Sequence, residues 1–268
     1  GSPCARLPFD VAFADTGDTL MCHGDDAHPP EPPVAGPLGD HGELTLISAD
    51  GTEVMAYAAR PEQPGETGVV ILPDVRGLHH FYKDLADGFA RAGFSTVAID
   101  YFARTAGNSA RDEAFAYRPH VEQTTPETVD TDVAAAIAYL RSPAGGAATR
   151  IFTVGFCFGG STSWRQSATQ DGLTGAVGFY GQPGRARAYI RQMRAPLLLL
   201  VAGDDFTPLE EFQAFDQELV DAGVSHCLVI YPGAPHSFFD RSFAEHREAC
   251  ADAWRQMLAF FDRPHTPA

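Results

Sequence analysis

The chain has 268 residues, of which 44% are hydrophobic, and a formal net charge of −16 from 19 basic and 35 acidic side chains. This length is enough for one α/β domain with a large core. The acidic balance argues against nucleic acid and against an anionic membrane as partners. No apolar run approaches the ~18 residues that a membrane-spanning helix needs.

The start of the chain and the cysteines indicate the compartment. No basic segment followed by an apolar stretch opens the sequence, so we expect no signal peptide. The five cysteines are odd in number and widely spaced, which favours thiols in a reducing compartment over a disulfide framework. Cys227 and Cys250 fall in strand and helix patterns and should pack as thiols. We therefore expect a cytoplasmic protein, either a monomer or a homodimer.

Residues 1–40 differ in composition from the rest of the chain. Proline, glycine, aspartate and histidine dominate 24–40, which favours an extended arm beside a domain formed by 41–268. Four residues of the arm are possible metal ligands: Cys4, Cys22, His23 and His28. Their spacing matches no familiar zinc pattern, so we expect no metal site.

Beyond residue 42, short apolar runs alternate with helical patterns. Two strands, 43–48 and 53–59, flank Asp50-Gly51, a dipeptide typical of a β-hairpin. Continuous apolar runs predict buried strands at 68–72, 95–99, 151–154, 176–180, 196–202 and 226–231. Amphipathic spacing predicts helices at 79–92, 127–141, 159–169, 209–222 and 242–261. This alternation predicts a mostly parallel sheet with helices on both faces, in a single α/β domain.

Cys157 stands at a predicted strand-to-helix turn, with Gly155 and Gly159 two residues to either side. This Gly-x-nucleophile-x-Gly arrangement is typical of a nucleophile elbow, here with cysteine in place of serine. The glycines relieve crowding in the turn, and the helix N-terminus favours negative charge on the sulfur or on an oxyanion. Cys157 is therefore the predicted nucleophile, although taken alone it could be a packed thiol.

A nucleophilic cysteine needs a base, and the base needs an acid to orient it. His236 follows the strand predicted at 226–231, while Asp204 and Asp205 follow the one at 196–202. Both strand ends belong to the edge where open α/β sheets place their sites. We prefer Asp204 as the acid because it directly follows the strand-end glycine, with Asp205 as the rival. A helix cap and a surface histidine are the non-catalytic alternatives, but three candidates in this order favour catalysis.

With these motifs the chain resembles the dienelactone hydrolases (carboxymethylenebutenolidases). The resemblance runs from about residue 43 to 261. It rests on Gly155-Phe156-Cys157-Phe158-Gly159-Gly160, Asp204-Asp205-Phe206-Thr207-Pro208 and His236-Ser237-Phe238. It implies the α/β-hydrolase fold and a triad of Cys157, His236 and Asp204. It also implies that the N–H groups of Phe158 and Val75 hold the oxyanion.

The resemblance further suggests residues around the thiol and the substrate. A family glutamate that meets the resting thiol falls on Asp74, whose shorter side chain is a departure. Of two family arginines that hold a substrate carboxylate, Arg104 matches one, or is a solvated surface charge, and Asp240 replaces the other. Tyr180 is expected to line the pocket, or to be a strand-end tyrosine with a solvated hydroxyl. Phe239 indicates an apolar pocket.

Together these residues predict a cysteine-dependent hydrolase of a small-molecule lactone or small carboxylic ester, without a cofactor. His236 would take the proton of Cys157, and water would release the acyl-enzyme. The alternatives are a thioesterase or general carboxylesterase on the same triad, and a non-catalytic protein that retains the pocket. Because only one arginine is matched, neutral substrates should compete well with those that carry a carboxylate.

Overall fold

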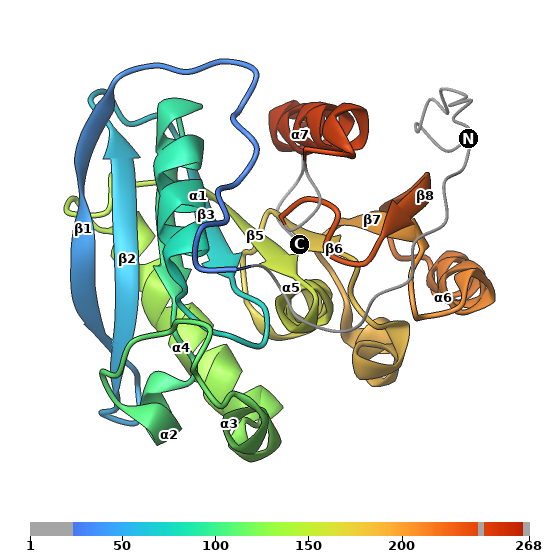
Figure 1. The fold of residues 1–268 in the computed structure, drawn as a ribbon, viewed down its shortest axis with the longest axis horizontal. Helices are drawn as coiled ribbons and strands as arrows, with labels where there is room; N and C mark the ends of the chain where they lie inside the picture. Colours follow the sequence, from blue (N-terminus) through green and yellow to red (C-terminus); the bar gives the residue numbers. More distant parts are fainter. Residues whose placement is uncertain (1–23, 241–243, 265–268) are drawn as a thin grey trace.

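The computed structural model describes residues 24–240 and 244–264. Within them, one mixed sheet has the strand order β1-β2-β4-β3-β5-β6-β7-β8 (Figure 1). The strands are β1 (Leu38–Ile47), β2 (Glu53–Pro61), β3 (Thr67–Leu72), β4 (Ser95–Ile99), β5 (Arg150–Phe156), β6 (Gly175–Phe179), β7 (Leu197–Asp204) and β8 (His226–Pro235). Strands β1 and β2 pair antiparallel with each other, as do β2 and β4, and all other neighbours are parallel. The predicted mostly parallel sheet is therefore confirmed.

Helices cover both faces of the sheet, as the sequence predicted. They are α1 (His80–Arg91), α2 (Ala103–Ala106), α3 (Arg118–Gln123), α4 (Pro126–Arg141), α5 (Phe158–Thr169), α6 (Leu209–Asp221), α7 (Arg247–Asp262) and the 3-10 turns η1 (Pro183–Arg185) and η2 (Arg187–Gln192). Apolar residues of α1 and α7 form one core cluster with the sheet, and those of α4, α5 and α6 form the other. In Figure 1 the sheet runs from β1 on the left to β8 on the right, with α7 above it.

The last helix begins later than the sequence predicted. It starts at Arg247, whereas residues 244–246 form a turn and a bend. The apolar face that α7 packs on the sheet begins only at Cys250, so nothing in the core requires helix before Arg247.

Residues 24–37 lie against α1 and α7. The indole nitrogen of Trp254 donates to the Pro30 carbonyl at 3.0 Å, and the Gly36 N–H donates to the Arg91 carbonyl at 2.6 Å. Strand β1 begins at Leu38, so residues 38–40, assigned to the arm from the sequence, belong to the sheet.

Of the four possible metal ligands of the arm, only His28 lies within the residues that the structure describes. His28 contacts Asp84 at 3.0 Å, whereas Cys4, Cys22 and His23 lie outside the described residues. Within residues 24–240 and 244–264, no group of three or more His, Cys, Asp or Glu side chains could hold a metal ion. Nor is any helix of these residues long and apolar enough to cross a membrane.

The cysteines differ from expectation at one position. Cys227 in β8 is disulfide-bonded, whereas Cys157 and Cys250 are thiols. Cys227 thus packs in the core as predicted, with 5% of its surface exposed, but the expectation that it is a thiol was wrong. A strand pattern shows only that Cys227 is buried, and a buried sulfur can be either a thiol or half of a disulfide.

The turn between β5 and α5 has no room for side chains at its glycines. A Cβ atom on Gly155 would lie 1.8 Å from the Gly159 carbonyl oxygen, and one on Gly159 would lie 2.0 Å from the Leu72 carbonyl oxygen. Because these neighbours are backbone atoms, no rotamer change can relieve the overlap. The two glycines therefore let the loop after β3 lie directly against the start of α5.

We predict that Gly159→Ala lowers the free energy of unfolding by at least ~2 kcal/mol, because the added methyl overlaps backbone atoms. Gly184→Ala is the matched control, since a Cβ there meets nothing within 4 Å, and should change stability by less than ~0.5 kcal/mol. Urea unfolding of both variants measures the difference. Equal stability of Gly159→Ala and the parent protein would contradict this packing.

Candidate active site

The candidate nucleophile, acid and base lie at one edge of the sheet, each directly after a parallel strand. Cys157 directly follows β5, Asp205 directly follows β7, and His236 directly follows β8. The carboxyl ends of parallel strands meet at a common edge, where α/β proteins place their ligands. Strand topology thus brings Cys157, His236 and Asp205, the rival candidate for the acid, to one edge of the sheet.

Cys157 has the strained backbone of a nucleophile elbow. Its φ of 55° and ψ of −113° lie outside the regions that side-chain-bearing residues favour. Its N–H donates to the Phe179 carbonyl at 3.0 Å, which ties the elbow to β6. Among the described residues only four non-glycine residues have positive φ, and Tyr180 and Ser237 at this edge are two others. Such strain is concentrated where the structure must aim a functional group.

The acid that meets the histidine is Asp205. His236 Nδ1 lies 2.8 Å from Asp205 Oδ2, and the Asp205 side chain is only 1% exposed. Asp204 instead ends β7 opposite Pro235 and is exposed. The prediction that Asp204 orients the base was therefore wrong. The pairing of β7 with β8 shifts in register between Ala202 and Asp204, and this irregularity decides which aspartate faces the site.

The environment of His236 favours its charged form. Burial alone would lower the pKa of this imidazole. The hydrogen bond to Asp205 and the interaction with Cys157, together with the negative charges of both partners, outweigh burial and raise the pKa of His236 to about 10. An imidazolium beside a thiol favours the thiolate. The surroundings of His236 therefore favour an imidazolium beside the Cys157 thiol.

The contact between His236 and Cys157 is not a well-aligned hydrogen bond. The Nε2 atom of His236 is buried and has no partner of regular hydrogen-bond geometry among the described residues. The Cys157 thiol nevertheless lies near enough to raise the pKa of the ring. Contacts of this kind often tighten only when substrate is bound.

We predict that Asp205→Asn lowers the pKa of His236 from its value of about 10, because a carboxylate that favours the imidazolium is lost. The matched change Asp204→Asn should leave the titration unchanged, because Asp204 does not contact the ring. NMR titration of the His236 ring protons measures both. A larger effect of Asp204→Asn would restore the original assignment.

Two backbone N–H groups are available near the nucleophile. Phe158 is the first residue of α5, and Val75 lies in the turn after β3. Neither N–H donates a hydrogen bond to another group in residues 24–240 and 244–264. Gly159 brings the two segments together, because a Cβ there would lie 2.4 Å from the Pro73 carbonyl oxygen. This leaves Phe158 and Val75 as candidate oxyanion donors.

Asp74 forms a buried ion pair within the same turn. Its side chain is 1% exposed, and its Oδ2 accepts from Arg76 Nη2 at 3.0 Å. Its Oδ1 accepts from the Arg76 N–H at 2.9 Å, and the Asp74 N–H donates to the Tyr82 hydroxyl at 3.0 Å. Asp74 thus helps to fix the turn that carries Val75, and its effect on the thiol stays a prediction.

Arg104 does not have the substrate-binding role predicted for it. Its Nη2 donates to Asp132 Oδ1 at 2.6 Å, and its Nη1 donates to Asp50 Oδ2 at 2.6 Å and to Thr52 Oγ1 at 2.9 Å. The guanidinium therefore joins α2 to α4 and to the β1–β2 hairpin. The sequence prediction was wrong because these carboxylates come from distant segments that the topology folds around Arg104.

The two aromatic residues predicted to line the pocket lie in different surroundings. Phe239 is fully buried, with its ring 4.6 Å from that of Phe179, so it is a core residue and the prediction was wrong. Tyr180 is 1% exposed, with its ring 4.9 Å from the His236 ring. Its hydroxyl donates to Asp240 at 3.2 Å rather than to solvent. Tyr180 thus packs against the imidazole.

Two residues near the site were not singled out from the sequence. Phe206 is 56% exposed, and its ring centroid lies 4.4 Å from that of His236. Arg185 in η1 is exposed, with its guanidinium 5.3 Å from the centre of the Phe158 ring. Phe206 follows Asp205 within the Gly-Asp-Asp-Phe motif, so its position was a usable signal, whereas nothing in the sequence places Arg185 beside Phe158.

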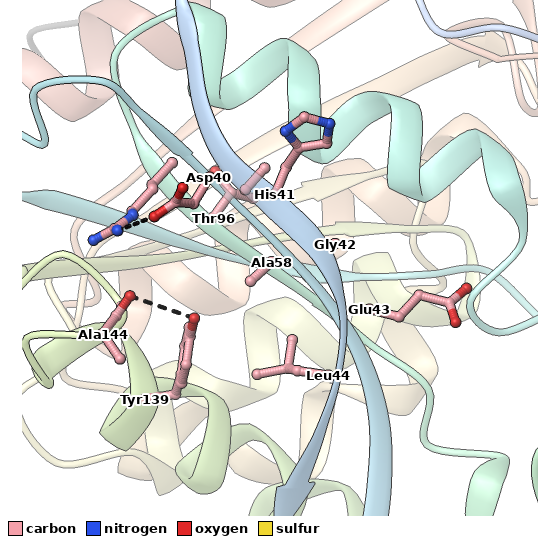
Figure 2. Close-up of a pocket in the computed structure, with 12 residues that line it drawn as sticks. Asp40, His41, Gly42, Glu43, Leu44, Ala58, Thr96, Tyr139 and Ala144 are labelled. Carbon is pink, nitrogen blue, oxygen red and sulfur yellow. Dashed lines mark hydrogen bonds and ion pairs between the residues drawn. The ribbon is translucent and has the colours of Figure 1, made fainter.

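A surface pocket lies away from this chemistry. It has a volume of about 360 Å³ and includes Asp40, Thr96, Tyr139 and Ala144 in its lining (Figure 2). Thr96 is near the amino end of β4, so the pocket opens at the opposite end of the parallel strands from Cys157. Ion pairing of Asp40 with Arg60 accounts for its charged lining.

The sheet order, the parallel register and the strand-end elbow together define a hydrolase of the α/β-hydrolase class. Within that class, the sequence model of the Dienelactone hydrolase family matches residues 54–264, and the chain belongs to this family. It is therefore a carboxylic ester hydrolase of the kind that acts on lactones and esters.

Individual relatives agree with the family assignment. A Yersinia pestis protein provisionally named carboxymethylenebutenolidase is 28% identical, over 83% of this chain and 88% of its own length. A Bradyrhizobium protein provisionally named 2-oxo-3-(5-oxofuran-2-ylidene)propanoate lactonase is 29% identical, over 80% of this chain and 91% of its own. The crystal structure of a provisionally named dienelactone hydrolase from Klebsiella pneumoniae has a TM-score of 0.71 at 26% identity. It covers 84% of this chain and 98% of that one.

Proposed function

We propose that this protein hydrolyses a neutral lactone or small ester through an acyl-enzyme on Cys157, with His236 as base and Asp205 as orienting acid. The observation that carries the proposal is the position of His236. Its Nδ1 meets the buried Asp205 carboxylate at 2.8 Å, while the same ring interacts with the Cys157 thiol. Nucleophile, base and acid in such contact form the minimal unit for acyl transfer.

The reaction begins from the thiolate–imidazolium pair. The Cys157 thiolate attacks the carbonyl carbon, and the negative charge moves to the carbonyl oxygen, which the N–H groups of Phe158 and Val75 can hold. His236 gives its proton to the leaving alkoxide, and the C–O bond breaks to leave a thioester. The neutral imidazole then takes a proton from water, which attacks the thioester and releases the acid and the thiolate.

The buried pair of Asp74 and Arg76 bears on the resting state of the thiol. A lone carboxylate near sulfur would disfavour the thiolate, because two negative charges would share one site. Pairing with the Arg76 guanidinium offsets much of that charge. We therefore expect Asp74 to raise the pKa of Cys157 only weakly, so that the resting enzyme keeps its thiolate.

The preference for a neutral substrate rests on the charges at this edge. Arg104 is engaged by Asp132 and Asp50, and the position four residues beyond His236 is the buried Asp240. Neither can bind a substrate carboxylate. The Bradyrhizobium relative is named as the lactonase of a propanoate, so its name supports a lactone as the substrate but not the neutral charge.

We predict that Cys157→Ala abolishes hydrolysis of a chromogenic ester, and that iodoacetamide labels Cys157 at neutral pH far faster than Cys250. Cys250 is the matched control within the chain, because burial raises its pKa to about 12 and its thiol donates to the Phe238 carbonyl. Mass spectrometry of alkylated peptides compares the two rates. Activity of Cys157→Ala near that of the parent protein would refute the mechanism.

We also predict that Arg104→Gln leaves unchanged the ratio of kcat/KM for a carboxylate-bearing dienelactone to that for a neutral lactone. The substitution removes contacts to Asp50 and Asp132, so it should lower thermal stability instead. Parallel kinetics on both lactones give the ratio. A fall of ~10-fold or more, equivalent to ~1.4 kcal/mol, would show that Arg104 reaches the substrate after all.

A further inference from the structure

Phe206 is an exposed aromatic residue beside the candidate active site. Four large apolar side chains are exposed among the described residues: Val34, Ile47, Phe206 and Val220. Phe206 is the only aromatic residue in this group, with 56% of its surface accessible. A single exposed apolar side chain is ordinary by itself, so its surroundings decide whether it has a function.

The Phe206 ring lies beside His236, the proposed catalytic base. The Phe206 ring centroid lies 4.4 Å from that of His236, at an interplanar angle of 42°. Part of the ring is thus against the imidazole, and more than half of the side chain surface faces solvent. An apolar group that approached the base from this side would bury that surface, which favours binding.

The turn that carries Phe206 is held in place by the same carboxylate that orients the base. Asp205 Oδ2 meets His236 Nδ1 at 2.8 Å, and Asp205 Oδ1 accepts from the Thr207 N–H at 3.1 Å. An aspartate that bonds the N–H two residues on forms a tight local turn. The ring of Phe206 is therefore presented on a fixed turn, and little conformational entropy is lost when a ligand packs on it.

We propose that Phe206 is a specificity-determining residue that binds the alcohol portion of the substrate and selects apolar, preferably aromatic, leaving groups. This inference rests on the proposed function. Because His236 delivers the proton to the leaving alkoxide, groups beside its ring lie next to the leaving alcohol rather than the acyl chain. The exposed carboxylate of Asp204, two residues before Phe206, further disfavours an anionic leaving group there.

The kinetic test compares benzyl acetate with methyl acetate, which share an acyl group and have leaving alcohols of similar acidity. Phe206→Ala should lower kcat/KM for benzyl acetate by ~10-fold and for methyl acetate by less than ~2-fold. Val220→Ala is the matched control, because Val220 has the same exposure, 56%, on helix α6. It should leave both values unchanged.

A loss of equal size for both esters would overturn the proposal, because it would mean that Phe206 only shields the pair of His236 and Asp205. No loss for either ester would overturn it as well. Circular dichroism of Phe206→Ala checks the fold, and an unchanged spectrum is expected for a side chain that is mostly exposed.

A binding measurement separates this inference from the proposed mechanism. Cys157→Ala should bind benzyl acetate without turning it over, and NMR titration gives the dissociation constant. The double variant Cys157→Ala with Phe206→Ala should bind it ~10-fold more weakly. Equal dissociation constants, or no binding by Cys157→Ala, would overturn the role of Phe206. Full activity of Cys157→Ala would overturn the mechanism, and the kinetic comparison of the two esters would then still test Phe206.

Discussion

The close approach of backbone segments at the elbow is the constraint on which the site depends. Three glycines bring neighbouring strands and loops within distances that a Cβ atom would forbid. Gly155 faces the Gly159 carbonyl, Gly159 faces the carbonyls of Leu72 and Pro73, and Gly160 faces the carbonyl of Phe179. The start of α5 is thereby pressed between the loop after β3 and the end of β6. This close packing holds Cys157 in its strained backbone conformation.

Three arginines around this elbow pair with carboxylates of the protein and stabilise its loops. Arg76 pairs with Asp74 in the turn after β3, and Arg104 joins α2 to α4 and the hairpin. At the end of β4, Arg111 lies 2.8 Å from the buried Asp100, where burial raises the aspartate pKa to about 6 although the arginine opposes it. The planar guanidinium can meet several acceptors at once, which suits it to such junctions. Arg76, Arg104 and Arg111 are thus engaged by the protein's own carboxylates.

Much of this architecture could be predicted because it depends on local patterns. Continuous apolar runs marked the buried strands, and the glycine spacing around Cys157 marked the elbow. The errors came from contacts between distant segments. Asp204 and Asp205 are adjacent, and only an irregular pairing of β7 with β8 decides which one meets His236. In the same way, no sequence pattern reveals that Asp132 and Asp50 surround Arg104, since they lie 28 and 54 residues away.

Asp205 affects both the charge of the His236 ring and the position of the Phe206 ring. Asp205 and His236 are both buried, and the rings of Tyr180 and Phe206 lie against the imidazole. This burial by itself would favour a neutral imidazole. The carboxylate reverses this preference, and low polarity around the pair strengthens their interaction. The other oxygen of the same carboxylate fixes the turn that presents Phe206. Loss of Asp205 would therefore change both the charge of the His236 ring and the position of the Phe206 ring beside it. Loss of Phe206 would leave the pair of His236 and Asp205 in place.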